Sequence, residues 1–289
     1  MRVGLCQVDG KLPNLALMKL SAWHKQQGDQ VAWFSPLEGF DRVCAAKVFD
    51  FTPDNAYLPP TAIKGGTGYD LTTNLPPEVE AMCPDYTLYP AMDYALGFTT
   101  RGCVRRCAFC VVPRKEGALR VVGDLHTFWT GQRKVILLDN NLTGAPMEHF
   151  ALILAQIRDN GLLVDFSQGL DVRLLTDDHA ALLAQVRLLK RIHLAWDNMR
   201  DEVAVRCGIA RMTKHMRPDE LMCYVLVGFN TSHQEDMHRI NALCEMGVNP
   251  YVMPYNKQDP RQAALTRWCN RPAIRKSTPF ERYSRRPVT

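Results

Sequence analysis

Two series of alternating strand-like and helix-like segments run along the chain, and a stretch without periodicity separates them. In the first series the strand-like runs cover residues 2–8, 29–36, 41–49 and 61–66. A helical spacing of Leu17, Leu20 and Trp23 follows the first run, between Pro13 and Gly28, which favour a helix start and a helix stop. Strands joined by a helix of this length predict a small doubly wound domain with a parallel sheet.

The second series contains strand-like runs with helical segments between them. The six strand-like runs cover residues 94–100, 134–142, 163–175, 191–198, 220–230 and 250–256, and the helical segments cover 122–132, 146–161, 176–190, 200–216 and 232–247. Most of the strand-like runs are almost continuously apolar, which indicates burial on both faces of a parallel sheet. Such units predict a curved, partial (β/α)6 barrel, with its chemistry at the C-terminal ends of the strands.

This pattern predicts an α/β protein of four parts. They are a Rossmann-like domain at residues 1–70, a linker rich in Pro and Thr at 71–93, a partial barrel at 94–256 and a basic extension at 257–289. No apolar run reaches the roughly 18 to 20 residues that cross a bilayer, and the first residues lack the pattern of a signal peptide. We therefore expect a cytoplasmic protein without membrane contact, in which thiols stay reduced.

Three cysteines lie close together in the loop after the first strand of the second series. They are Cys103, Cys107 and Cys110, within the stretch RGCVRRCAFCVVPRKEG at residues 101–117. Three thiolates are one too few for a closed zinc site. A [4Fe–4S] cluster has four irons, so three thiolates leave one iron free to bind a substrate. The spacing therefore predicts an iron–sulfur site with one open corner.

This CxxxCxxC pattern, with Phe109 before the last cysteine, resembles the radical S-adenosylmethionine (radical SAM) family over residues 94–256. The resemblance implies an enzyme in which the open iron binds the amino and carboxylate groups of S-adenosylmethionine. It also implies that one electron, from a donor such as flavodoxin, cleaves this molecule to methionine and a 5′-deoxyadenosyl radical. That radical abstracts hydrogen from a second substrate.

The same resemblance implies positions that contact S-adenosylmethionine. Asp139, Asn140 and Asn141 follow the second strand, where the family holds the amino group, although the family's Gly-Gly-Glu is missing here. The other implied contacts are Ser167, Gln168 and Arg173, with the arginine suited to the carboxylate, Trp196 and Asp197 for the ribose, Gly228 for close approach of the adenine, and the backbone of Met253 and Tyr255 for the adenine.

A zinc site is the alternative for the cysteine loop, with His126 as a fourth ligand. Zinc modules usually pair their cysteines in knuckles separated by a dozen residues or more, so this spacing favours the iron–sulfur cluster. A metal-stapled loop in a protein that binds nucleic acid without turnover is the matching alternative from another functional class.

The N-terminal segment 13–31 resembles the cobalamin-binding-like module that precedes the barrel in one radical SAM subfamily. The chain lacks the Asp-x-His-x-x-Gly loop that ligates cobalt, and His24 lies within the predicted helix. A cobalamin-dependent methyltransferase therefore stays open but is disfavoured. The stretch 109–117 also resembles the methylthiotransferases that modify tRNA, although a C-terminal RNA-binding barrel of that family has no room in this chain.

The other cysteines predict no second cluster, because none of them forms a CxxC pair. Cys6, Cys44, Cys207, Cys223 and Cys244 fall in strand or helix patterns, so we expect small buried hydrophobes there. Cys83 and Cys269 lie in irregular segments, and no pattern assigns them a role.

The net charge of +5 is concentrated near the C-terminus. From Arg261 onward eight basic residues, Arg285 and Arg286 among them, face one acid, Glu281, so the rest of the chain carries −2. Trp268, Phe280 and Tyr283 are interleaved with these arginines. Arginine with aromatic residues can hold phosphates and stack on bases, which predicts a nucleotide or nucleic-acid substrate bound by this tail.

Overall fold

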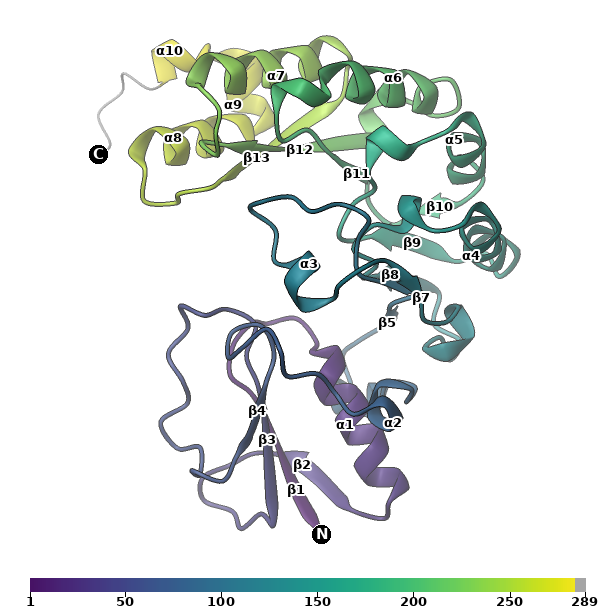
Figure 1. Ribbon diagram of the computed structural model, residues 1–289, viewed down its shortest axis with the longest axis vertical. Coiled ribbons are helices and arrows are strands. Elements are labelled where there is room, and N and C mark those ends of the chain that lie inside the picture. The colour runs from purple at the N-terminus through teal and green to yellow at the C-terminus, as the bar shows by residue number, and fades with distance from the viewer. Residues whose placement is uncertain (284–289) are drawn as a thin grey trace.

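The computed structural model describes residues 1–283 and confirms an α/β protein built on parallel sheets (Figure 1). The N-terminal sheet has the strand order β2-β1-β3-β4, and all of its pairs are parallel. Its elements are β1 (Arg2–Gln7), α1 (Leu15–Gln26), β2 (Gln30–Trp33), β3 (Arg42–Ala46) and β4 (Ile63–Gly65). Helix α1 begins where predicted, because the Asn14 side chain accepts a hydrogen bond from the Leu17 N–H.

The two faces of the N-terminal sheet are covered differently. Leu17 and Met18 of α1 pack on Val3 and Leu5 in one buried cluster. On the other face Cys6 is contacted by the long loop between β3 and β4, through an amide of that loop 3.6 Å from its sulfur. Helices therefore lie on one face only, whereas a doubly wound sheet carries them on both.

The second part contains two further parallel sheets, with the orders β10-β9-β8-β5 and β11-β12-β13. Their strands are β5 (Tyr94–Gly97), β8 (Lys134–Leu137), β9 (Leu163–Phe166), β10 (Arg187–Leu188), β11 (Ile192–Ala195), β12 (Leu221–Val227) and β13 (Asn249–Pro254). A hydrogen bond of 2.8 Å from the Leu170 N–H to the His193 carbonyl links the end of β9 to β11. The long strands thus follow one another in chain order from β5 to β13.

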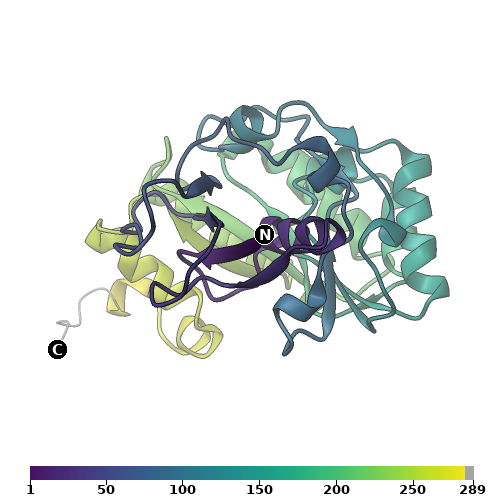
Figure 2. The ribbon, with the colours of Figure 1, turned by 90° about the horizontal axis from the view of Figure 1, so that it is seen from below.

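Helices cover the outer side of these strands, as Figure 1 shows. They are α4 (Met147–Asp159), α5 (Asp177–Leu183), α6 (Glu202–Met212), α7 (His233–Glu245), α8 (Pro260–Cys269), α9 (Pro272–Ser277) and α10 (Phe280–Tyr283). Seen from below, the N-terminal sheet lies in front of this second part (Figure 2). On β12, buried Cys223 and Val225 face the helices and alternate with half-buried residues on the inner side. The inner face of β12 is therefore only partly covered by other residues.

Several predicted elements are shorter than expected, and the helix predicted at 176–190 ends at Leu183, so that Arg187–Leu188 form strand β10 instead. The helix predicted at 122–132 is only a 3₁₀ turn, η2 (Leu125–Thr127), because Phe128 turns inward against β5. A Cβ atom added to Gly97 would lie 2.3 Å from the Phe128 ring, so this close approach needs glycine. The strand predicted at 163–175 ends at Phe166, and a second 3₁₀ turn, η4 (Val172–Leu174), follows it.

The predicted linker is a packed connector rather than a loose segment. It contains α2 (Pro77–Glu80) and η1 (Tyr86–Leu88), and its Asp85 side chain accepts hydrogen bonds from Ser21 and Lys25 of α1. The Tyr86 hydroxyl donates to the Phe128 carbonyl at 2.5 Å and accepts from the Leu96 N–H at 3.2 Å. Tyr86 therefore ties the connector to the start of the second part.

The aromatic residues of the basic extension belong to the core, which makes the predicted base stacking by this tail wrong. Trp268 and Phe280 are buried with ring centroids 5.4 Å apart, and half-buried Tyr283 packs on the same core. Arg285 and Arg286 lie outside the described residues.

The cysteine predictions hold in part. Cys6, Cys44 and Cys223 are buried, as expected for small hydrophobes. Cys207 and Cys244 are exposed, so the same prediction is wrong for these two, because their helix positions face solvent. No helix within residues 1–283 is long and apolar enough to span a membrane.

We expect Tyr86→Phe to lower the free energy of unfolding by about 1–3 kcal/mol, because it leaves the Leu96 N–H and the Phe128 carbonyl without their partner. Chemical denaturation of the full chain measures this change. Tyr57→Phe is the matched control, since Tyr57 is 71% exposed. Equal stability of the two variants would contradict the role of the Tyr86 hydroxyl.

Candidate functional site

The cysteine loop connects β5 to β8 and folds back on itself. Strand β6 (Thr100–Arg101) pairs antiparallel with β7 (Arg120–Val121), and the Cys103 N–H donates to the Gly117 carbonyl at 3.3 Å. Gly102 has φ +80°, and a Cβ atom there would lie 2.3 Å from the Ala118 carbonyl oxygen. The three cysteines thus lie beyond a closed stem, at the C-terminal end of the parallel strands, where the sequence predicted them.

Asp139, at the end of β8, holds the chain that enters this loop. Its carboxylate is buried and accepts hydrogen bonds from the N–H groups of Thr99 and Thr100 and, at 2.7 Å each, from both hydroxyls. Four of these contacts fall on Oδ1, and Oδ2 accepts only from the Thr99 N–H, at 3.2 Å. Asp139 therefore orders the loop through Oδ1, and Oδ2 is the less engaged of its two oxygens.

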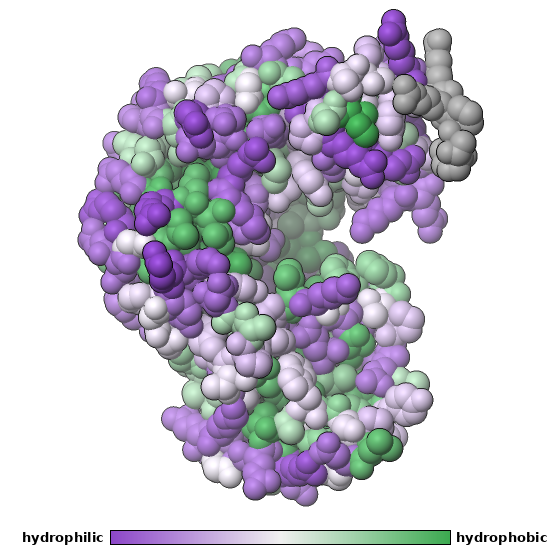
Figure 3. Space-filling view, turned by 180° about the vertical axis from the view of Figure 1, so that it is seen from behind, coloured by the Kyte–Doolittle hydropathy of each residue, from purple (hydrophilic) through white to green (hydrophobic). Residues whose placement is uncertain are grey.

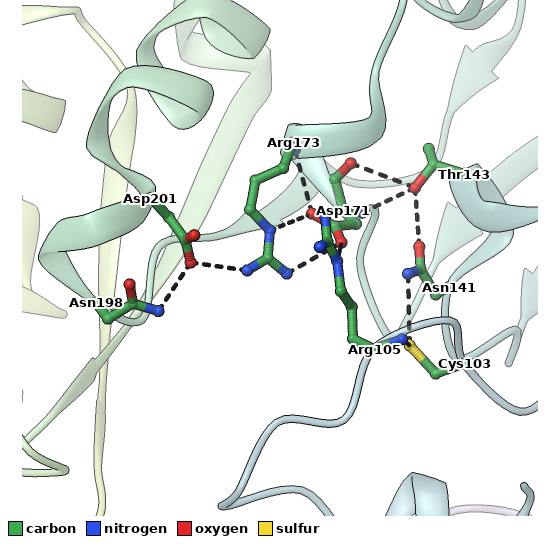
Figure 4. A network of polar contacts seen from close by, with 8 residues as sticks. All are labelled: Cys103, Arg105, Asn141, Thr143, Asp171, Arg173, Asn198 and Asp201. Carbon is green, nitrogen blue, oxygen red and sulfur yellow. Dashed lines mark hydrogen bonds and ion pairs between the residues drawn. The ribbon is translucent and has the colours of Figure 1, made fainter. Parts of the chain in front are cut away.

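The next two residues continue this contact with the loop. Asn140 accepts from the Gly102 N–H at 3.2 Å, and the Asn141 amide lies 3.5 Å from the Cys103 sulfur as a donor (Figure 4). The Arg105 N–H donates to the same sulfur at 3.3 Å. Two N–H groups are thus directed at the sulfur of Cys103, and hydrogen bonds of this kind orient and tune cysteine ligands in metal sites.

Arg173 lies at the centre of the polar network in Figure 4. Its guanidinium donates to both oxygens of Asp171, at 2.7 and 3.0 Å, and to Asp201 at 2.8 Å. Arg105 adds a second cation on Asp171 at 2.8 Å. Burial raises the pKa of Asp171, but the hydrogen bonds and charges of Arg173 and Arg105 outweigh it, so the net pKa is lowered. Three of the five N–H donors of Arg173 are in use, and two remain for a ligand.

Electrostatic coupling links Cys107 to both other cysteines. Burial is the main cause that raises the pKa of the Cys107 thiol; Arg173 lowers it, whereas Asp197, Cys110 and Cys103 raise it further. The pKa of Asp197 is itself raised, chiefly by burial. The ion pair of Arg105 with Asp171, at 2.8 Å, places the cysteine loop beside the predicted carboxylate-binding residue Arg173.

A chain of aromatic rings joins the cysteine loop to the last two strands. Phe109 meets Phe229, after β12, with centroids 5.4 Å apart, and Phe229 meets Tyr255, after β13, at 4.8 Å. Both contacts are edge-to-face, the preferred geometry of such pairs. The predicted contacts Phe109 and Tyr255 are thus brought together by Phe229.

The structure places the other predicted contacts in different surroundings. Trp196 is fully buried in the core, and its indole N–H donates to the Asn198 carbonyl at 2.9 Å. The space beside Gly228 is filled by Gln262, because a Cβ atom on Gly228 would lie 2.2 Å from that side chain. Of the remaining positions, Gln168 and Met253 are exposed and Ser167 is half-buried.

The three cysteines of the loop do not form a site for a single metal ion. Within residues 1–283 no three His, Cys, Asp or Glu side chains form a group that could hold one metal ion. His126, the alternative zinc ligand, is exposed and lies beside the Trp129 ring. A four-iron cluster is larger than one ion, so its thiolates sit on separate corners and lie farther apart than the ligands of zinc. Three cysteine thiolates on one loop are the kind of donor that an iron–sulfur cluster takes.

The N-terminal sheet offers a poor fit to cobalamin. Its strand order reverses between β1 and β3, and ligands of open α/β sheets bind at such a point, beyond the strand ends. Here Asp9 bridges the two loops, accepting from the N–H groups of Val48 and Phe49 at 2.8 and 2.7 Å. His24 is buried in α1 and hydrogen-bonds to Asp29, so it is not available as a cobalt ligand.

Three contributors to the site had no role in the sequence prediction. Asp171 lies two residues before Arg173, Phe229 follows Gly228, and Arg105 lies inside the cysteine motif. The sequence does contain a signal for Asp171, because an acidic residue close to a predicted ligand-binding arginine can pair with it. The contact between Phe109 and Phe229 joins distant segments, and no local pattern reports it.

Comparison with known proteins does not identify a family for this chain. No protein-family model matches this sequence, and no curated protein matches it. The function is therefore argued from the cysteine loop and its surroundings.

We expect Asp139→Ala to lower the free energy of unfolding by about 3 kcal/mol or more, because it leaves the buried donors of Thr99 and Thr100 unpaired. In the metal-free protein the cysteines should also react faster with a thiol reagent. Asp159→Ala is the control, since Asp159 pairs with its neighbour Arg158 at the surface. Unchanged thiol reactivity would show that Asp139 does not order the loop.

Asp171→Asn should lower stability by about 2–4 kcal/mol at pH 7, because it removes the buried partner of two arginines. The folded-state pKa of Asp171 is lowered, so its contribution is full above the unfolded pKa of about 3.9 and is lost as pH falls through the folded value. Unfolding curves of variant and parent should therefore converge in acid. A stability difference independent of pH would contradict this role.

Proposed function

We propose that the chain is a radical SAM enzyme whose residues 94–256 form the partial (β/α)6 barrel of that family. The observation that carries the proposal is the ordered loop with Cys103, Cys107 and Cys110, held at the C-terminal ends of parallel strands by the residues that follow β8. Sites in α/β folds of this kind lie at that end.

The three cysteines would hold three irons of a [4Fe–4S] cluster. Asn141 and the Arg105 N–H donate toward the Cys103 sulfur, and such hydrogen bonds tune the reduction potential of a cluster. When bound, the cluster supplies the electron that splits S-adenosylmethionine into methionine and a 5′-deoxyadenosyl radical. An electron donor such as flavodoxin would reduce it.

Two features of the surroundings suit S-adenosylmethionine. Arg173 keeps two unused N–H donors, and a planar guanidinium matches a carboxylate through paired hydrogen bonds. Asp171 and Asp201 fix the orientation of this guanidinium. The rings of Phe109, Phe229 and Tyr255 offer apolar faces to the adenine and exclude water from the reacting atoms.

A protein that binds nucleic acid without turnover is the second candidate function. Basic residues at the end of the cysteine loop, Lys115 and Arg120, favour it because they can bind phosphates. The metal content separates the two. A brown protein with about four irons per chain after anaerobic reconstitution supports the enzyme, whereas a colourless protein with one zinc supports the binding protein.

We expect Cys107→Ala to abolish both the absorbance of the cluster and the formation of 5′-deoxyadenosine from S-adenosylmethionine under dithionite. Cys207→Ala is the matched control, since Cys207 is an exposed cysteine on α6. The control should keep both properties. Full cleavage activity in Cys107→Ala would refute the proposal.

A further inference from the structure

The connection between β3 and β4 is unusually long for a loop without regular structure. It covers the sixteen residues 47–62, and none of them lies in a helix or strand. Loops of this length in compact proteins are uncommon and usually functional. We call residues 48–57 the aromatic loop, because Phe49, Phe51 and Tyr57 are all exposed there, Phe51 to 73%. The Phe49 and Phe51 rings stack with centroids 5.2 Å apart.

The aromatic loop is held in place from both sides at its base. On one side Asp9 accepts from two of its backbone N–H groups, as described above. On the other side the Gly68 N–H donates to the Lys47 carbonyl at 2.9 Å, and a Cβ atom at Gly68 would lie 2.7 Å from the Phe49 carbonyl oxygen. The exposed ring pair is therefore preorganised, which lowers the entropic cost of binding a flat ligand.

The aromatic loop faces the candidate site. The Lys257 ammonium lies 5.9 Å from the Phe51 ring centroid. Lys257 follows β13 by three residues and lies close in sequence to Tyr255, the end of the ring chain that leads through Phe229 to the cysteine loop. Figure 3 shows the hollow between the N-terminal part and the C-terminal helices, with hydrophobic residues on its walls.

A groove of about 810 Å³ runs from the base of the aromatic loop, at Lys47 and Val48, past apolar residues of α1 to the far end of the cysteine loop, at Lys115 and Arg120. Its lining holds three glutamates, Glu78, Glu80 and Glu116, against the seven basic residues Lys19, Arg42, Lys47, Lys64, Arg101, Lys115 and Arg120. Within the described part of the chain, Arg42, Lys47, Lys115 and Arg120 have no carboxylate at ion-pair distance. The groove therefore carries uncompensated positive charge.

We infer that the aromatic loop and this groove bind a single-stranded nucleic acid. A base stacks on the exposed Phe49 and Phe51 rings, and phosphates lie along Arg42, Lys115 and Arg120. Every base has a flat face that stacks on aromatic rings, and lysine and arginine neutralise the backbone. An acidic protein would also meet the cations, but it would leave the stacked ring pair without a partner. The inference names the substrate class of the proposed function and rests on it for the reaction.

Fluorescence anisotropy with a labelled single-stranded RNA of mixed sequence tests this inference on the full chain. Phe49→Ala/Phe51→Ala should weaken binding about 5- to 150-fold, the range of one lost stacking contact. Leu37→Ala is the matched control, since Leu37 is 95% exposed in the same part of the chain, and it should bind as the parent does. Parent-like binding by the double phenylalanine variant overturns the inference.

Salt dependence tests the groove separately. Lys115→Gln and Arg120→Gln should each reduce the slope of log K against log salt by about 0.7, the value for one phosphate contact of a single strand. Arg267→Gln and Lys276→Gln remove the same charges from exposed positions of α8 and α9 and should leave the slope unchanged. Equal effects of the two pairs, or equal affinity for duplex RNA, overturn the inference.

The same variants separate this inference from the proposed function. Iron content and substrate-free formation of 5′-deoxyadenosine should stay at the parental level in Phe49→Ala/Phe51→Ala, because neither ring touches the cysteine loop. Loss of RNA binding with cleavage intact supports the inference. RNA binding by a chain that holds no iron would refute the enzyme while leaving the binding surface in place. Capture of flavodoxin but not RNA by the groove overturns the inference alone.

Discussion

The Asp139 carboxylate accepts hydrogen bonds from the backbone and side chains of both Thr99 and Thr100, and it does so in the buried space between β5 and β8. This interaction fixes where the chain leaves β5 and hence where the first cysteine lies. Asp139 follows β8, the strand next to β5. The start of the cysteine loop is therefore held by the sheet and not only by contacts within the loop.

Charge is balanced across the strand ends in the same region. Asp171 is buried between Arg173 and Arg105, and Asp201 takes a further donor of Arg173. The pairs join the cysteine loop, η4 and the start of α6, which come from distant parts of the sequence. Each carboxylate orients the arginine that it binds and also occupies some of the N–H donors of that arginine. The remaining donors are those that a ligand carboxylate can use.

The two halves of the molecule meet around one opening. Tyr86 ties the connector to β5, and the aromatic loop reaches Lys257 beyond β13. The N-terminal sheet thereby supplies one wall of the hollow in front of the strand ends, although Asp9 occupies its own ligand crevice. The aromatic residues of the C-terminal extension serve packing instead.

Most of the longer strands and helices, the parallel sheets and the place of the three cysteines after β5 followed from the sequence alone. Apolar runs, Pro13, Gly28 and the cysteine spacing are local signals, and each acts within a few residues. The roles of Asp139 and Trp196 depended on the tertiary structure, since a polar or aromatic residue after a strand can face the ligand or the core. Trp268 and Phe280 show the same limit, because burial is decided by what packs on a helix and not by its neighbours in sequence. The ring chain from Phe109 to Tyr255 and the wall formed by the aromatic loop join segments far apart in the chain, and only the folded structure brings them together.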